Sequence, residues 1–270
     1  MAAPTYDAEA LVCRRTKLGE TDVILTLLDA QGRQLRAVAK GARKPSSPFS
    51  SRLETGSVCR LLLARGRSLD IVKEARIVQA HSSIRTDHER FAAAAVVLEL
   101  ASKTSMPELE NERLYALSVA ALDRMAKCPA ESLLPLAAAS VLKMLAYSGF
   151  RPGFDACVAC GQPIDLLAPP GMLRHFSAAE GGVLCDECAR TALSRLERTG
   201  VLQAGNHLLH ATFDQVADAV VSGALRCDAA ADALQVAGEL ARAHLQTRLP
   251  SVDFLSSIAG SARSHEDSPC

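Results

Sequence analysis

The stretch of residues 8–40, AEALVCRRTKLGETDVILTLLDAQGRQLRAVAK, decides the fold of the N-terminal part of the chain. It contains three short runs rich in Val, Leu and Ile, at residues 8–16, 23–29 and 34–40. The turn signals Leu18-Gly19-Glu20-Thr21 and Gln31-Gly32 separate these runs. Branched apolar runs bounded by glycine-containing turns are typical of β-strands, so the stretch predicts three strands in succession.

Two further runs of the same kind follow at residues 58–64 and 69–78, and Arg65-Gly66-Arg67-Ser68 joins them. Residues 1–80 are therefore expected to form one module of five short strands. A small closed barrel of five strands is typical of the oligonucleotide-binding fold, the OB-fold. An SH3-like barrel is the nearest structural alternative.

Positive charge is concentrated in this module, although the 270 residues carry 30 Lys or Arg and 30 Asp or Glu in total. Residues 33–76 contain 11 basic and 3 acidic side chains, a net charge of +8, while residues 81–270 carry a net charge of −6. A compact basic module beside an acidic remainder indicates an anionic partner such as nucleic acid. A solvated basic face balanced by acidic neighbours is the alternative interpretation.

The segment from Gly41 to Arg52 has two prolines and four serines, which are typical of a loop. Its single aromatic residue, Phe49, could stack on bases or pack back on the barrel. Because the chain has no Trp and few aromatic residues, we expect phosphate contacts without base readout to dominate. The candidate side chains for these contacts are Arg33, Arg36, Lys40, Arg43, Lys44, Arg52, Arg65 and Arg67.

The apolar spacing becomes helical after residue 81 and predicts an α-helical bundle from residues 81–150 and 191–255. A capping box from Thr212 to Gln215 marks the start of one helix. Residues 256–270 are polar and small and are expected to be disordered. The other helices are expected at residues 89–105, 108–127 (opened by Pro107), 131–147, 187–198 and 229–248.

The insertion of residues 151–190 carries the strongest local motif, two Cys-x-x-Cys pairs separated by 24 residues. Two residues between cysteines let both thiolates of one turn reach the same ion, and two such turns complete a tetrahedral site. We expect Cys157, Cys160, Cys185 and Cys188 to bind a structural Zn²⁺. A redox dithiol pair or an iron–sulfur cluster is the alternative. The complete fold class is α+β and multidomain: a barrel, then a bundle with an inserted zinc knuckle.

Several function classes are disfavoured by motifs that the sequence lacks. It has no phosphate-binding loop, dinucleotide-binding glycine motif, nucleophile elbow or His-Glu-x-x-His motif, so we expect a protein that is not an enzyme. The apolar runs are short for a membrane span, and the N-terminus lacks the order of a secretory signal. We therefore expect a cytoplasmic protein that does not bind membranes.

Several blocks of the sequence resemble the bacterial RecO family of recombination mediators and DNA repair proteins. Residues 9–28, with Gly19-Glu20-Thr21-Asp22 between two strands, are similar to the family's opening, and residues 40–45 with 49–54 to its most recognisable block. Residues 145–150 and the two cysteine knuckles resemble its zinc-bearing members. The blocks occur in the family's order over residues 8–190; over residues 191–255 only helix spacing agrees.

The resemblance implies an OB-fold, a helical bundle and a zinc knuckle in one protein. It also implies binding of single- and double-stranded DNA and annealing of complementary strands. The partners that it implies are RecR, the acidic C-terminal tail of single-stranded DNA-binding protein and, indirectly, RecA. The last expected helix lacks the basic segment found in many members, so its part in binding stays open.

Two other classes of function compete with this interpretation. A zinc-containing enzyme that acts on nucleic acid would need an open metal position, which four cysteines do not leave. A zinc-ribbon and OB-fold adaptor, such as a transcription or ribosome accessory factor, would use the same basic barrel to bind RNA. A preference for structured RNA over single-stranded DNA would favour the adaptor.

Overall fold

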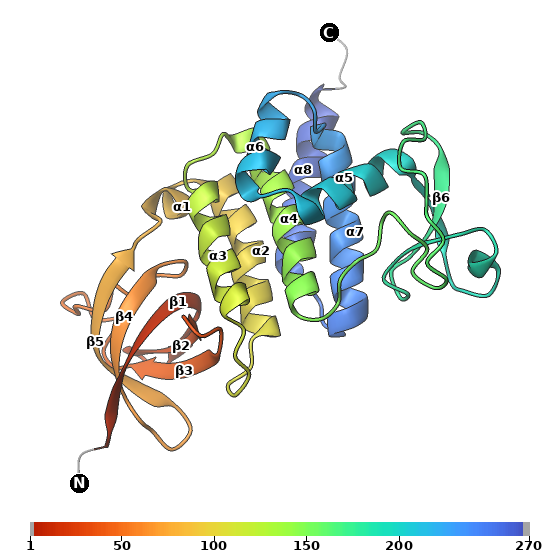
Figure 1. Ribbon diagram of the computed structural model, residues 1–270. Coiled ribbons are helices and arrows are strands. Elements are labelled where there is room, and N and C mark those ends of the chain that lie inside the picture. The colour runs from red at the N-terminus through yellow and green to blue at the C-terminus, as the bar shows by residue number, and fades with distance from the viewer. Residues whose placement is uncertain (1–2, 267–270) are drawn as a thin grey trace. The chain divides into compact units, whose positions relative to one another are not determined.

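The computed structural model describes residues 3–266 of the chain (Figure 1). The chain divides into two compact units. The first comprises Met1–His88 and Val97–Ala126, and the second comprises Glu89–Val96 and Lys127–Cys270. The barrel therefore shares its unit with helical residues that the sequence pattern had grouped with the bundle.

Five strands in the first unit close into a barrel in the order β1-β2-β3-β5-β4, as Figure 1 shows in red to orange. All neighbouring pairs are antiparallel except β3 and β5, which run parallel. The predicted OB-like barrel is thereby confirmed. Its strands are β1 (Thr5–Leu18), β2 (Asp22–Asp29), β3 (Gln34–Ala39), β4 (Val58–Ala64) and β5 (Asp70–Gln79).

Alternation of side chains along the strands fills the barrel and leaves an outer face. On β2, Val23, Leu25 and Leu27 belong to the buried core, while Ile24 and Thr26 between them stay half-exposed. This is the period-two pattern of a strand with one buried face. A β-bulge between Val12 and Arg14 shifts the register of β1 against β2.

Three helices of the chain contribute to the first unit: α1 (Ser82–Thr86), part of α2 (His88–Thr104) and α3 (Glu112–Met125). The expected start of α3 after Pro107 is wrong. The helix begins where the Asn111 side chain accepts a hydrogen bond from the Leu114 N–H. Residues 106–109 form a bridge instead, because Met106 pairs with Leu109 and accepts a hydrogen bond from the Gln34 N–H.

The second unit is built around α4 (Leu133–Tyr147), which is buried along almost its whole length. Helix α4 packs against α5 (Thr199–His210), α6 (Phe213–Val221) and α7 (Cys227–Leu245), and the short 3-10 helix η1 (Ala130–Ser132) precedes it. The predicted capping box at Thr212 is present at the start of α6. The segment Ala130–Tyr147 has the length and apolarity of a membrane span, but most of it is buried inside the unit, as in a core helix.

The expectation of disorder after residue 255 is wrong for residues 256–266, which continue helix α8 (Pro250–Glu266). Proline at the first helical position suits the start of this helix. Val252 and Leu255 are buried, and a side chain at Gly238 of α7 would collide with Val252. The helix is therefore held against α7 by apolar contacts at helical spacing. Residues 267–270 lie outside the described part of the chain.

A small three-stranded sheet carries the cysteine module, in the order β7-β6-β8. Its strands are β6 (Leu173–Ser177), β7 (Gly182–Leu184) and β8 (Arg195–Arg198), and Figure 1 shows β6 in green beside α5. The expected helix over residues 187–198 is wrong, since only the 3-10 turn η2 (Cys188–Arg190) forms there. Residues 195–198 pair with β6 instead, and Arg195 and Arg198 form ion pairs with Glu239 and Asp232 of α7.

Candidate metal centre and nucleic-acid interface

The first cysteine knuckle is a tight turn between residues 155 and 164. The Cys157 N–H donates to the Gln162 carbonyl at 2.8 Å, and the Gly161 N–H donates to the Cys157 carbonyl at 2.8 Å. Gly161 adopts φ +78°, in the left-handed region that glycine enters without strain. This turn brings Cys157 and Cys160 to the same side.

The second knuckle joins the end of β7 to η2, where the Ala189 N–H donates to the Cys185 carbonyl at 3.0 Å. The Val158 N–H donates to the Val183 carbonyl at 2.9 Å and ties the two knuckles together. Gly182 is required beside this contact, because a Cβ there would lie 2.1 Å from the Gly153 carbonyl oxygen.

The four predicted cysteine sulfurs lie within 4.8 Å of one another. Cys160 Sγ and Cys185 Sγ are 3.7 Å apart. Cys157 and Cys185 are buried in a small apolar cluster with Leu184, whereas Cys160 is exposed. Four sulfurs at this separation could hold one metal ion and would leave it no open position.

The acidities of these thiols differ because their surroundings differ. Burial alone would raise the pKa of Cys157, but the backbone N–H groups of Cys185, Cys160 and Ala159 hydrogen bond to its sulfur and lower the pKa to about 6. The side-chain hydrogen bond with Cys185 raises the pKa of Cys188 to about 12. In the absence of a cation, Cys157 is therefore more acidic than Cys188. A bound metal ion is what allows all four sulfurs to ionise together.

The barrel offers a second candidate site on the outer face of β1, β2 and β3. Strand register places Arg14, Thr26 and Arg36 in one row across the three strands. The next row contains Thr16, Ile24 and Val38, and Ile71 of β5 continues it beside Val38.

Three of the predicted phosphate contacts gather at the beginning of the loop between β3 and β4. Arg43 is exposed, and its Nη1 donates to the carbonyl oxygens of Gly19 at 3.1 Å and Glu20 at 2.8 Å in the β1–β2 turn. Lys40 and Lys44 are exposed and form no ion pair with residues 3–266. The hydrogen bond from the Gly41 N–H is the main cause that lowers the pKa of Asp22, and the charges of Lys40 and Lys44 lower it further.

Three more predicted contacts gather around the β4–β5 turn. The parallel pairing of Ala37 with Asp70 brings Arg36 beside this turn, which carries Arg65 and Arg67. Arg65 lies over the Tyr6 ring, with its guanidinium carbon 4.6 Å from the ring centroid. Arg36 and Arg67 are exposed and have no ion-pair partner in the described chain.

The remaining two predicted contacts have partners within the barrel unit. Arg33 donates to the buried Asp29 carboxylate at 3.0 Å, and its Nη1 lies 3.6 Å from Glu110. Its first role is therefore to neutralise Asp29. Arg52 donates to the Ala75 carbonyl at 3.3 Å and keeps an exposed side chain. Phe49, in the same loop, packs against the barrel core and is partly buried.

Sequence reasoning missed two cations on this surface, Arg14 and Lys73. The bulge after Val12 turns the exposed Arg14 into the row of Arg36. Lys73 is exposed on β5 two residues after Ile71, as Lys40 is two residues after Val38. The neighbouring arginines at 14 and 15 indicated that β1 could add a cation to the outer face. Alternation within one strand does not show which of the two faces outward.

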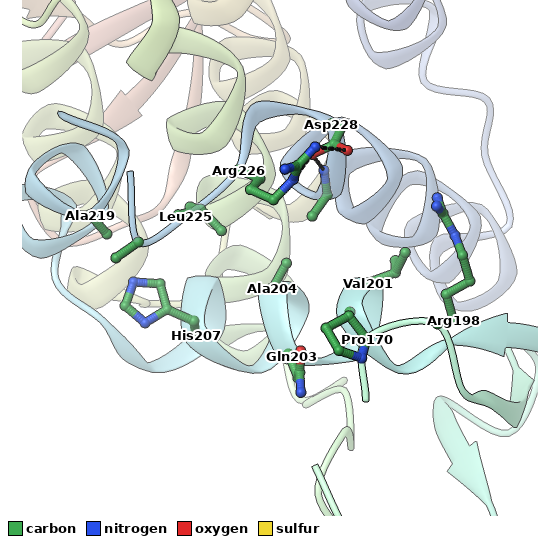
Figure 2. A pocket seen from close by; sticks show the side chains of 14 residues that line it. Pro170, Arg198, Val201, Gln203, Ala204, His207, Ala219, Leu225, Arg226 and Asp228 are labelled. Atoms are coloured by element: carbon green, nitrogen blue, oxygen red, sulfur yellow. Dashed lines mark hydrogen bonds and ion pairs between the residues drawn. The ribbon is translucent and has the colours of Figure 1, made fainter. Parts of the chain in front are cut away.

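The second unit contains a pocket of about 520 Å³ between α5 and the connection from α6 to α7 (Figure 2). Val201, Ala204 and His207 recur at helical spacing along α5 and line one side. The first residues of α7 line the other side, where Arg226 donates twice to Asp228 at 3.0 Å. The pocket is mostly apolar, and the Asp228 carboxylate on its α7 side is paired with Arg226 and accepts a hydrogen bond from the Ala229 N–H, so the pocket suits a mostly apolar ligand.

The barrel with a cationic face and the four-cysteine centre define the class of an OB-barrel protein with a candidate nucleic-acid surface and a metal clip. Residues 1–81 match the family described as Recombination protein O N terminal, and residues 85–252 match Recombination protein O C terminal. The chain therefore belongs to the Recombination protein O family of DNA repair proteins, as its sequence blocks predicted.

Relatives in this family extend over most of the chain. The chain is 37% identical over 248 residues to the DNA repair protein RecO of Frankia casuarinae, covering 91% of this chain and 94% of the relative. It is 39% identical over 184 residues to RecO of Bifidobacterium adolescentis, covering 67% and 73%. It is 26% identical over 251 residues to RecO of a Thermoanaerobacter species, covering 93% and 96%.

Proposed function

We propose that this protein is a cytoplasmic recombination mediator that works without catalysing a covalent reaction. It binds single- and double-stranded DNA without sequence preference and anneals complementary strands. With RecR, it helps to load RecA onto DNA coated by single-stranded DNA-binding protein. Membership of the family supports this role, and the single structural observation that carries it is the cationic outer face of the barrel.

The placement of the cations supports DNA binding by this face. OB-folds bind oligonucleotides on the face of strands 2 and 3 and on the loops between strands 1 and 2 and strands 4 and 5. Here Arg36 lies on that face, Arg43 contacts the first of these loops, and Arg67 belongs to the second. Exposed cations without acidic partners are available to phosphates, so affinity should fall with salt.

Annealing follows from charge neutralisation on this surface. Two like-charged strands repel one another, and bound cations remove that repulsion so that base pairing supplies the free energy. No nucleotide hydrolysis is needed. The test is the annealing rate of complementary oligonucleotides without ATP, with and without the coating protein, at two salt concentrations.

The variant Arg43→Glu/Lys44→Glu tests the assignment of the surface. It should weaken DNA binding strongly and flatten the dependence of affinity on salt. The matched control is Arg60→Glu/Arg76→Glu. These two cations lie opposite one another in the register of β4 and β5, away from the proposed DNA-binding face. Equal affinity of the first variant and the wild type would refute the assignment. A preference for structured RNA over single-stranded DNA would favour the adaptor function instead.

Zinc is the ion that the four cysteines are proposed to hold, because a tetrahedral set of four thiolates suits Zn²⁺ and closes its coordination. Bound zinc would stabilise the second unit without contacting DNA. Purified protein should contain one zinc per chain, and Cys157→Ala/Cys185→Ala should lose the metal and melt at a lower temperature. Cys13→Ala, a buried thiol outside the cluster, is the control for the metal content.

The pocket beside α5 is the proposed binding site for the acidic tail of single-stranded DNA-binding protein. Its apolar wall suits the apolar side chains of such a peptide, and Arg198 and Arg226 in its lining are the cations that its carboxylates could approach. Ala204→Glu would place a like charge in the pocket and should reduce the affinity for a tail peptide in fluorescence anisotropy. Affinity for naked DNA should not change, since the barrel is proposed to provide it.

A further inference from the structure

The outer face of the barrel carries an aliphatic strip between two cationic strips. The aliphatic strip consists of Ile24, Val38 and Ile71, which strand register places side by side on β2, β3 and β5. All three side chains remain partly exposed while their strand neighbours fill the barrel core. Such a strip can contact the faces of bases without holding them by aromatic stacking.

The first cationic strip is formed by Arg14, Arg36 and Arg67. Arg14 and Arg36 face the same side because both align with Thr26 of β2. The β4–β5 turn carries the exposed Arg67 and leads into β5 beside Ala37, the residue that follows Arg36, so Arg67 joins the strip at its β5 end. The nearby Asp70 accepts hydrogen bonds from the Tyr6 hydroxyl and the Gly66 N–H, which occupy its oxygens.

The second cationic strip is formed by Lys40, Arg43 and Lys44 on the other side of the aliphatic strip. Asp22 and Glu20 are the acids beside it, and the Asp22 carboxylate is engaged by the Gly41 N–H at 2.8 Å. Lys40 follows Arg36 by four residues of strand, which corresponds to a separation of about 13 Å. Lysine and arginine side chains on both strips can lean outward and extend this span.

We propose that the barrel holds two single strands at once, one on each cationic strip, with the bases of both strands over the aliphatic strip. This inference rests on the proposed function and deepens it. One strand placed with its bases over the aliphatic strip uses the cations on one side only, so the opposite strip remains for a second strand. The bases then meet between the two neutralised backbones, where pairing can begin.

The composition of the strip fits this arrangement. Strong aromatic stacking would hold each base in place and would oppose its transfer into a duplex. Phe49, the one aromatic residue of the β3–β4 loop, packs against the barrel core and is partly buried. Aliphatic contacts shield the bases from water, but they are weak enough for a base to leave the strip and pair with a base of the other strand.

Native mass spectrometry of the full chain with oligothymidylate tests the stoichiometry. Strands of about 10 nucleotides match the site of one OB-fold and cannot pair with one another. We expect complexes of one chain with two oligonucleotides. One oligonucleotide per chain under conditions that still support annealing would overturn the proposal.

Two double variants test the division into strips. The measurements are made in low salt, where the unaltered strip stays saturated with DNA. Arg14→Ala/Arg36→Ala and Lys40→Ala/Lys44→Ala should then each bind one oligonucleotide per chain. Each variant should anneal complementary strands more slowly than the wild type, by about tenfold or more. Arg60→Ala/Arg76→Ala removes the same charge from β4 and β5 and should bind two oligonucleotides and anneal like the wild type.

The outcomes separate this proposal from the proposed function. In the strip variants, the annealing rate could fall only in proportion to the affinity for a single oligonucleotide. That result would overturn the two-strand arrangement and leave the proposed DNA-binding function standing. Failure of the folded wild-type chain to bind any strand would overturn both. Two strands on the wild type and one on each strip variant would support the arrangement.

Discussion

The His81 ring lies between two hydrogen-bond acceptors, with Nε2 2.8 Å from Asp123 Oδ1 and Nδ1 2.7 Å from the Gly56 carbonyl oxygen. Its side chain is only 5% exposed. Each ring nitrogen therefore lies within hydrogen-bond distance of an oxygen that accepts, one on the α3 side chain and one on the backbone before β4. His81 also adopts φ +44°, in the left-handed region that non-glycine residues rarely enter. The surrounding contacts hold this conformation and join the barrel to α3.

His81→Ala should destabilise the protein by about 1–3 kcal/mol, because the ring that lies between Asp123 and the Gly56 carbonyl is lost with its hydrogen bonding. The midpoint of urea unfolding, followed by circular dichroism, measures the change. His88→Ala, at an exposed position seven residues later, is the control and should change stability little. A loss no larger than that of the control would show that the hydrogen bonds of the His81 ring contribute nothing.

Arg33 and Arg36 lie three residues apart but should respond oppositely to replacement by alanine. Arg33→Ala leaves the carboxylate of Asp29, which is 2% exposed, without its counter-ion and should cost about 1–3 kcal/mol of stability. Arg36→Ala should leave the unfolding midpoint unchanged and reduce the slope of log affinity against log salt for single strands by about 0.7. Unfolding curves and salt titrations of both variants distinguish the roles. The reverse pattern would mean that the two assignments are exchanged.

Gly32 and Gly19 both have positive φ, at +80° and +57°, but only Gly32 is also crowded. A Cβ at Gly32 would lie 1.9 Å from the Asn111 carbonyl oxygen, whereas a Cβ at Gly19 meets no atom within 4 Å. Gly19→Ala should cost about 1 kcal/mol for the left-handed backbone alone. Gly32→Ala should cost clearly more, because the β2–β3 turn must move away from the start of α3. Similar melting temperatures for the two variants would contradict the close approach.

Alkaline conditions should weaken the barrel through Cys13. Burial raises the pKa of this thiol to about 12, whereas an exposed thiol ionises near pH 8.5. Below about pH 8.5 both states are protonated and the stabilisation is complete; as pH rises toward 12, only the unfolded chain ionises and the stabilisation is lost. The slope is about 1.4 kcal/mol per pH unit for one proton.

Urea unfolding between pH 8 and 11 measures this loss. Cys13→Ala should reduce the alkaline slope by up to one proton, while Cys59, whose pKa burial raises to about 11, continues to contribute. Leu11→Ala truncates a buried neighbour without removing a thiol and should lower stability at every pH with the slope unchanged. An unaltered slope in Cys13→Ala would refute the role of this thiol.

Local sequence patterns predicted the elements whose signals lie within a few residues. The five strands and the capping box at Thr212 were identified from alternation and capping residues, and the cysteine ligands from their spacing. The segment 187–198 was predicted as a helix because its residues suit one. Pairing of β8 with β6 and ion pairs to α7 override that local preference. Residues 256–266 are polar and small, so no local pattern showed that they extend the helix that begins at Pro250 and buries Val252 and Leu255.

The sequence by itself determined the class of the molecule: a basic barrel of five strands, apolar helices and a four-cysteine clip, because these depend on periodicity, charge and short spacing. Only the tertiary structure decided which cations share a face. The bulge after Val12 aligns Arg14 with Arg36, and the parallel pairing of β3 with β5 adds Arg67. The burial of Asp29 directs Arg33 inward. Strand register joins residues distant in the chain, and alternation within one strand carries no information about its partner.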